Sequence, residues 1–141
     1  MDITSAALAT LISSSVATIV ALTFNRANAI KNLHDRLDSI LKIAIQYPYL
    51  ENSRFTSSWN DNKNSDDERF LRYENYCILV FNYLESFSKY YKYDKVKIEN
   101  QLNIKEWVRI HRDYWENPPG LYENTDGYSR GFKDLVSSYL K

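Results

Sequence analysis

One uncharged run near the start of the chain constrains its fold more than any other feature. From Ile3 to Asn25 there is no Asp, Glu, Lys, Arg or His, although charged residues make up 26% of the 141 residues. As a single helix, this run would be about 34 Å long, which is enough to cross a hydrocarbon core of about 30 Å. The sequence therefore predicts a transmembrane helix over residues 1–25.

The composition of the run leaves two alternatives open. Nine of its residues are large and apolar and 13 are Ala, Ser or Thr, so it could also be a buried helix of a soluble protein. A cleaved secretory signal is the other alternative, because residues 27–29 read Ala-Asn-Ala and mimic a cleavage site. For a retained span, Arg26, Lys31 and Arg36 follow the run, and the positive-inside rule places the rest of the chain in the cytoplasm.

Small side chains repeat every four residues along the predicted span, and residues four apart lie nearly above one another on a helix. They are Ser5, Ala9, Ser13, Ala17 and Ala21. Such a column lets helices approach closely in a bilayer, so we expect it to drive homo-oligomerisation. The alternative is that the column reflects only how common small residues are in membrane helices.

After Asn25 the apolar positions follow the spacing of an amphipathic helix. They are Ile30, Leu33, Leu37, Ile40 and Ala44, and Pro48 ends the pattern because proline does not continue a helix. We expect residues 26–47 to form a stalk helix that continues the membrane helix.

Residues 48–141 are expected to form a small helical domain rich in aromatic side chains. Aromatic residues make up 15% of the chain, with 12 Tyr, whereas Gly and Pro number three each, which favours packed helices over a many-turned β fold. Ser65 and Glu68 form a capping-box pattern, and the apolar residues from Phe70 to Tyr91 then keep helical spacing. The predicted fold class is all-α.

The remaining segments of this domain predict shorter elements. Residues 51–64 read as a loop that the apolar residues Phe55 and Trp59 attach to the core. Asp94 and Asn103 are candidate N-caps for one broken helix or two short ones, and Thr125 is a candidate cap for a last helix.

Composition argues against several classes of function. The 18 basic and 18 acidic residues balance, whereas proteins that bind duplex DNA usually carry an excess of positive charge. With two His and one Cys, Cys77, we expect neither a metal site nor a disulfide. No glycine-rich phosphate loop or nucleophile motif is present, so the sequence implies no cofactor and no catalytic residue.

The segment around His111 holds the densest mixture of charged and aromatic residues. We interpret His111 as part of a core-facing stripe with Trp107 and Trp115, and Arg109 and Arg112 as its solvated face. The alternative is that Arg109, His111 and Arg112 contact a ligand, or that His111 serves a hydrolase.

Lysines alternate with tyrosines where the predicted long helix ends. The candidate ligand contacts are Lys89, Lys92, Lys95 and Lys97, with Tyr90, Tyr91 and Tyr93 between them. Lysines bind phosphate and tyrosine rings stack on bases, which is the chemistry of nucleotide or short oligonucleotide recognition. Arg69 and Arg72, one helical turn apart, are candidates for the same phosphate site. The alternative is an ordinary solvated helix end.

Three segments together resemble a group of small bacterial proteins with an N-terminal anchor and a helical cytoplasmic domain. They are Tyr47-Pro48-Tyr49-Leu50-Glu51, Tyr73-x-x-Tyr76-Cys77 and the run from Trp107 to Trp115 that contains His111. The layout is also similar to that of small membrane effectors of bacterial antiphage systems, including those driven by cyclic oligonucleotides in type III CRISPR immunity. The resemblance implies the bacterial inner membrane and offers no catalytic residues to carry over to this chain.

These observations lead to one preferred function and two others. The preferred one is a membrane-anchored, self-associating sensor or effector whose cytoplasmic domain binds a signal, such as a cyclic or short oligonucleotide messenger in antiphage defence. The second is a membrane adaptor that docks a protein partner, and the third is a hydrolase built around His111.

Overall fold

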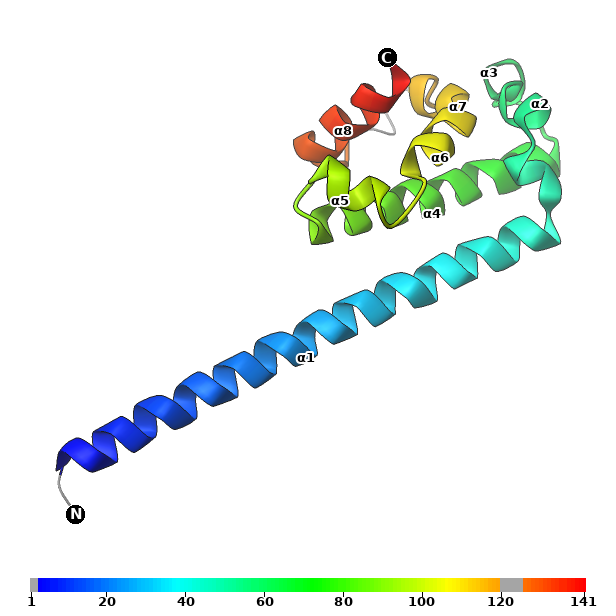
Figure 1. Cartoon of the computed structure of the whole chain (residues 1–141). Coiled ribbons are helices and arrows are strands. Elements are labelled where there is room, and N and C mark those ends of the chain that lie inside the picture. The colour runs from blue at the N-terminus through cyan, green and yellow to red at the C-terminus, as the bar shows by residue number, and fades with distance from the viewer. Residues whose placement is uncertain (1–2, 120–125) are drawn as a thin grey trace. The chain divides into compact units, whose positions relative to one another are not determined.

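The computed structural model of the chain describes residues 3–119 and 126–141, with the side chains of residues 3–16 left out. Within these ranges the chain forms helices and turns and no strand, which confirms the all-α fold class. The elements are α1 (Ile3–Gln46), the 3-10 helix η1 (Pro48–Glu51), α2 (Ser53–Thr56), α3 (Trp59–Asn62), α4 (Glu68–Tyr90), α5 (Lys95–Glu99), α6 (Ile104–Ile110), α7 (Arg112–Glu116) and α8 (Arg130–Leu140) (Figure 1).

The N-terminal helix α1 runs without a break through the predicted span and the predicted stalk. It ends at Gln46, two residues before Pro48, because a proline restricts the residue before it to extended geometry and cannot continue a helix. The chain divides into two compact units, residues 1–35 and residues 36–141, so α1 contributes its last part to the second unit.

The structure does not support the predicted transmembrane helix over residues 1–25. In the part of the chain that it describes, no helix is both long and apolar enough to cross a membrane. The predicted column of small residues lies mostly outside that part, because the side chains of Ser5, Ala9 and Ser13 are not described. Its remaining members, Ala17 and Ala21, are exposed.

Helix α4 is the central element of the second unit, and its apolar spacing explains why. Phe70, Tyr73, Cys77, Val80, Leu84 and Phe87 repeat at intervals of three and four residues, and all six are buried. The sequence predicts this helix and this face, and both are confirmed from Phe70 to Phe87; the last predicted member of the face, Tyr91, is the C-cap residue after α4 and is only half-buried. The expected aromatic-rich core is also present, with Trp59, Tyr73, Tyr76, Phe81, Tyr83 and Phe132 at 0 or 1% exposure.

The start of α4 corrects the predicted capping box. The side chain of Asp67, and not that of Ser65, accepts a hydrogen bond from a backbone N–H of the first turn, at 2.9 Å from Arg69 N. The Ser65 hydroxyl is buried and has no hydrogen-bond partner among the described residues. Asp67 is closer to the helix and carries a charge that complements the helix N-terminus, so it displaces Ser65 as the cap.

Two predicted regions differ from expectation in detail. Residues 51–64 are not a plain loop, because α2 and α3 form there as single turns. Trp59 is fully buried, as expected of a residue that attaches this segment to the core, and its indole Nε1 donates to the Asn117 carbonyl at 2.8 Å. The segment after Asn103 is two short helices, α6 and α7, separated at His111. The candidate cap Thr125 lies outside the described residues.

Aromatic contacts join the short C-terminal helices to α4. On α7, Tyr114 stacks on Phe81 of α4 at 6.0 Å between ring centroids, and Trp115 lies 4.8 Å from the same ring. Trp115 also contacts Phe132 of α8 edge-on at 5.9 Å. These contacts fix α7 and α8 against α4 and thereby hold the corner between α6 and α7 in place.

Candidate functional site

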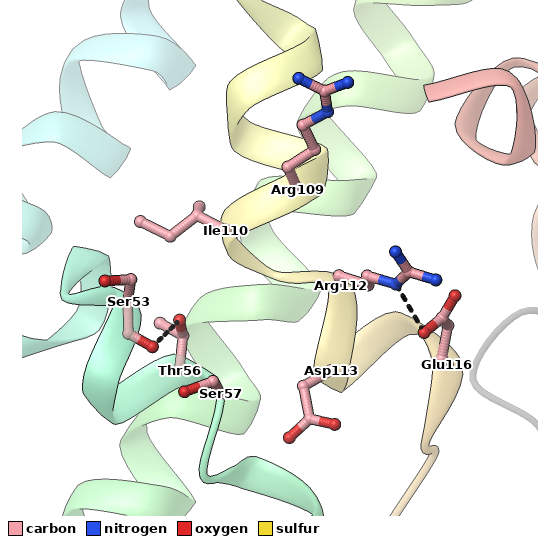
Figure 2. Close-up of a pocket in the computed structure, with 8 residues that line it drawn as sticks. All are labelled: Ser53, Thr56, Ser57, Arg109, Ile110, Arg112, Asp113 and Glu116. Carbon is pink, nitrogen blue, oxygen red and sulfur yellow. Dashed lines mark hydrogen bonds and ion pairs between the residues drawn. The ribbon is translucent and has the colours of Figure 1, made fainter. Parts of the chain in front are cut away.

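A surface hollow of about 330 Å³ lies between α2 and the α6–α7 corner. We call it the arginine hollow; its lining is Ser53, Thr56, Ser57, Arg109, Ile110, Arg112, Asp113 and Glu116. Figure 2 shows Arg109 and Arg112 extending from successive helices with their guanidinium groups well separated, and the three hydroxyl residues on the facing element. Both guanidinium groups are turned away from these hydroxyls, that of Arg112 toward Glu116, so the lining holds two separate cations apart from its hydroxyl groups.

A second hollow of about 400 Å³ adjoins the first. We call it the glutamate hollow; it is lined by Glu51, Ser53, Glu106, Trp107, Arg109 and Ile110. Ser53, Arg109 and Ile110 line both hollows, so the two are neighbours with Arg109 between them, and we refer to the pair as the groove.

The charged side chains that line the arginine hollow differ in the length of the hydrogen bonds that they make within the domain. Arg112 donates from Nε to Glu116 at 2.8 Å, and this hydrogen bond raises the pKa of Arg112. The carboxylate of Asp113 accepts from the Asn60 backbone N–H at 2.8 Å and from the Asn117 amide at 2.8 Å, so it ties α3 to α7.

Arg109 has the weakest partners of these groups. Its Nε lies 3.4 Å from the Tyr139 carbonyl and its Nη1 lies 3.5 Å from the carboxylate of Glu106. Hydrogen bonds from a guanidinium are usually about 2.7–2.9 Å when strong. Arg109 is therefore the cation of the groove that a ligand can engage with the smallest loss of existing contacts.

Behind the groove, a buried chain of hydrogen bonds centres on His111. His111 is 0% exposed; its Nδ1 lies 3.0 Å from the hydroxyl of Tyr73, and its Nε2 lies 3.4 Å from Oε1 of Glu51. The hydroxyl of Tyr76 also donates to Oε1 of Glu51. A proton on Nε2 satisfies both contacts of His111, since Tyr73 then donates to Nδ1 and Nε2 donates to Glu51.

Burial keeps the other members of this chain protonated. Burial is the largest cause that raises the pKa values of Tyr73 and Tyr76 above that of a free phenol, so both hydroxyls remain donors at neutral pH. Burial also raises the pKa of the Cys77 thiol, whose Sγ lies 3.8 Å from Nδ1 of His111. A reactive thiolate needs the opposite shift and solvent access, so this arrangement does not activate Cys77 as a nucleophile.

The three segments that carry the sequence resemblance meet in this buried chain. Glu51 comes from the first segment, Tyr73, Tyr76 and Cys77 from the second, and His111 from the third. Glu51, Tyr73 and Tyr76 were not expected at a site from the sequence. Tyr73 had a signal, since helical spacing assigns this hydroxyl-bearing side chain to the core, whereas Glu51 and Tyr76 had none.

The predicted ligand residues around His111 separate into two environments. Arg109 and Arg112 are exposed and line the arginine hollow, whereas His111 and Trp115 are buried, as the packing interpretation expects. Trp107, the third member of the expected core stripe, is only half-buried. The structure thus brings the two arginines together at a hollow without the histidine.

The predicted lysine and tyrosine contacts are engaged within the domain. Lys89 pairs with Glu85 at 3.1 Å, Lys97 pairs with Asp94 at 3.1 Å, and Lys95 lies 4.6 Å from the Tyr139 ring centroid. The hydroxyl of Tyr93 lies 2.8 Å from that of Ser129, and Tyr90 and Tyr91 contact each other edge-on at 5.0 Å. None of these residues, nor Lys92, lines the groove.

Arg69 and Arg72 also lie away from the groove. Arg69 pairs with Asp67 at 2.6 Å. Arg72 pairs with Glu68, donates to the Tyr49 hydroxyl at 2.9 Å and lies 4.2 Å above the Tyr47 ring. Arg72 therefore links η1 to α4, and the structure does not bring either arginine to the lysine segment.

Comparison with known proteins gives no guide to the function of this site, so its function is inferred from its own residues. No protein family, curated protein or solved structure matches the chain, so the resemblance to anchored bacterial proteins stays a prediction. In the described ranges, no group of three or more His, Cys, Asp and Glu is arranged to hold a metal ion.

Proposed function

We propose that this chain is a membrane-anchored, non-enzymatic binding protein whose helical domain, residues 36–141, takes a small anionic ligand of the nucleotide class in the groove. The observation that carries the proposal is the state of Arg109, a cation at the centre of a groove whose present contacts are 3.4 and 3.5 Å long. A phosphate oxygen would replace these contacts with shorter, charge-assisted ones.

The separation of Arg109 and Arg112 refines the class of ligand. A single bidentate anion engages one guanidinium, whereas a ligand with two linked anionic groups engages both. The hydroxyls of Ser53 and Ser57 on the facing element complement a sugar or a phosphate ester. A nucleoside diphosphate or a short oligonucleotide has this combination of groups.

The proposed anchor is the N-terminal part of α1. The side chains of Ile19, Val20, Leu22 and Phe24 are 55–67% exposed, and the whole run from Ile3 to Asn25 lacks charge. Exposed apolar surface of this extent marks contact with a membrane or a protein. Arg26, Lys31 and Arg36 on its C-terminal side favour a cytoplasmic domain, and self-association through the small column remains part of the proposal.

A second candidate function is a membrane adaptor that docks a protein partner. It is favoured by one surface of α4, where Leu71, Ile78 and Leu79 are 50, 38 and 46% exposed. Binding of a nucleotide by the isolated protein separates the two candidates, since the adaptor requires no small ligand.

The test uses the full-length chain, extracted with detergent from carbonate-washed membranes, and isothermal titration with ADP, GDP, cyclic dinucleotides, short oligonucleotides and inorganic pyrophosphate. We expect retention in the washed membranes, saturable binding that weakens with salt, and at least a tenfold loss of affinity in Arg109→Glu. Arg130→Glu is the matched control, because Arg130 is 95% exposed on α8 and lies outside the groove lining.

Two results would contradict the proposal. Recovery of the whole chain in the soluble fraction would remove the anchor. Absence of binding by every compound, or equal loss in the Arg109→Glu and Arg130→Glu variants, would remove the groove as a ligand site and leave the adaptor ahead.

A further inference from the structure

Among the residues that the structure describes, Glu51 alone belongs both to the buried hydrogen-bond chain and to the wall of the groove. Its Oε1 receives hydrogen bonds from Tyr76 and His111, which are 1 and 0% exposed, while its own side chain is 26% exposed and lines the glutamate hollow. Two buried donors therefore fix the orientation of a carboxylate that faces solvent. Within the described residues no hydrogen bond engages its second oxygen, Oε2, which is left to a ligand.

The rest of the glutamate hollow supplies a flat apolar surface and a second acceptor. Trp107 is half-buried and held edge-on against Tyr83 at 6.1 Å, so its ring has a defined position. Ile110 lies next to it in the lining, and Glu106 adds an exposed carboxylate. Aromatic rings of this kind stack on nucleobases.

The hydrogen-bonding groups of the glutamate hollow determine which nucleobase it can bind. Ionised carboxylates accept hydrogen bonds and cannot donate them, so a base must present N–H donors to Glu51. Guanine carries two adjacent donors, the N1–H and the N2 amine, and these match the two lone pairs of Oε2, since Oε1 already accepts from Tyr76 and His111. Hypoxanthine lacks the N2 amine, and adenine places an acceptor, N1, beside its amine.

We infer that the groove is a guanine-nucleotide site, with the base in the glutamate hollow against Glu51 and Trp107 and the phosphates at Arg109 and Arg112. This inference rests on the proposed function and adds the identity of the base and of the residue that reads it. Arg109, at the junction of the two hollows, is then the contact nearest the ribose and first phosphate.

The experiment compares GDP, IDP, ADP and pyrophosphate by isothermal titration against the full-length protein in detergent. We expect GDP to bind at least tenfold more tightly than IDP or ADP. Trp107 is the half-buried tryptophan, whereas Trp59 and Trp115 are buried, so GDP should quench the intrinsic fluorescence and pyrophosphate should not. This comparison needs no variant and does not depend on the folding of a mutant.

Glu51→Gln tests the residue itself. The amide oxygen of Gln still accepts from Tyr76 and His111, but its NH₂ group replaces the free acceptor, so the tenfold preference for GDP over IDP should disappear while pyrophosphate affinity is kept. Glu68→Gln, on the exposed side of α4 and paired with Arg72, is the matched control and should keep the preference.

The outcomes separate this inference from the proposed function. Equal affinities for GDP, IDP and ADP that still depend on Arg109, or tighter binding of ADP, would overturn the guanine assignment and leave the anion site standing. An unchanged GDP preference in a folded Glu51→Gln variant would overturn the role of Glu51. No binding by any of the four compounds would overturn the guanine assignment, and the proposed function would fall with it only if the cyclic dinucleotides and short oligonucleotides also failed to bind.

Discussion

Replacing Tyr73 with Phe should destabilise the helical domain, although the change removes one oxygen atom. The hydroxyl of Tyr73 donates to Nδ1 of His111 at 3.0 Å, and both residues are 0% exposed. In Tyr73→Phe, Nδ1 keeps only the weak contact with the Cys77 thiol at 3.8 Å. A buried polar atom left unpaired costs about 1–3 kcal/mol, and we expect a loss of about 2 kcal/mol in the free energy of unfolding.

Tyr139→Phe is the matched control for this change. The hydroxyl of Tyr139 is also buried but has no hydrogen-bond partner of ordinary geometry among the described residues. The carboxylate of Glu99 is nearby and, after burial, is the next cause that raises the pKa of Tyr139. Removing an unpaired buried hydroxyl relieves desolvation, so Tyr139→Phe should leave the stability unchanged or raise it slightly.

Urea unfolding followed by tryptophan fluorescence measures both variants, because Trp59, Trp107 and Trp115 all lie in the domain. For a slope of about 2 kcal/mol per molar urea, a loss of about 2 kcal/mol lowers the midpoint by about 1 M with the slope unchanged. If Tyr73→Phe moves the midpoint no further than Tyr139→Phe does, the buried chain does not stabilise the domain and our account of His111 is wrong.

Two more predictions concern alkaline pH and the turn after α4. Burial raises the pKa values of Tyr73 and Tyr76 and raises those of Tyr83 and Tyr128 to about 12, so above pH 10 the unfolded chain releases protons that the folded chain keeps. The free energy of unfolding, followed by urea titration, should therefore fall between pH 10 and 12 by about 1.4 kcal/mol per pH unit for each fully buried phenol, and a flat profile would contradict the burial of these hydroxyls. Lys92 has a backbone φ of 54° and an exposed side chain, so Lys92→Gly should raise the free energy of unfolding by about 1 kcal/mol in the same assay. Nucleotide affinity should not change. A loss of stability would show that the left-handed turn is not strained.

Local patterns were sufficient to predict the elements of the fold where packing and periodicity agree. The apolar residues that repeat every three or four positions along α4 are buried. Helix α1 ends before Pro48 because a proline ring cannot continue a helix. The N-terminus of α4 was mispredicted because Ser65 and Asp67 both have capping chemistry, and spacing alone does not rank them. Burial of Phe70 in the core fixes where the first turn of α4 begins, and this position makes Asp67 the N-cap residue.

The groove was only partly predictable, because residues far apart in the sequence form it. Arg109 and Arg112 were candidates from local charge, but Ser53 and Glu51, which complete the hollows, are more than 50 residues earlier in the chain. The lysine segment had a stronger local signal, yet Lys89 and Lys97 pair with carboxylates one helical turn away. Local clustering of charge does not show which cations lack firm partners in the fold.

The hydrogen-bond partners in the buried chain behind the groove follow from the need to pair buried polar groups and not from a sequence motif. Helical spacing assigns Tyr73, Cys77 and His111 to core-facing positions, and buried polar groups are almost always hydrogen-bonded. Tyr73 supplies a donor to an imidazole, and the remaining imidazole N–H then requires an acceptor, which a core of aromatic and aliphatic residues does not contain. A carboxylate at the edge of the core meets this need without full burial of its charge. Glu51 occupies that place, 26% exposed in the lining of the glutamate hollow, which is the geometry that the Glu51→Gln titration tests.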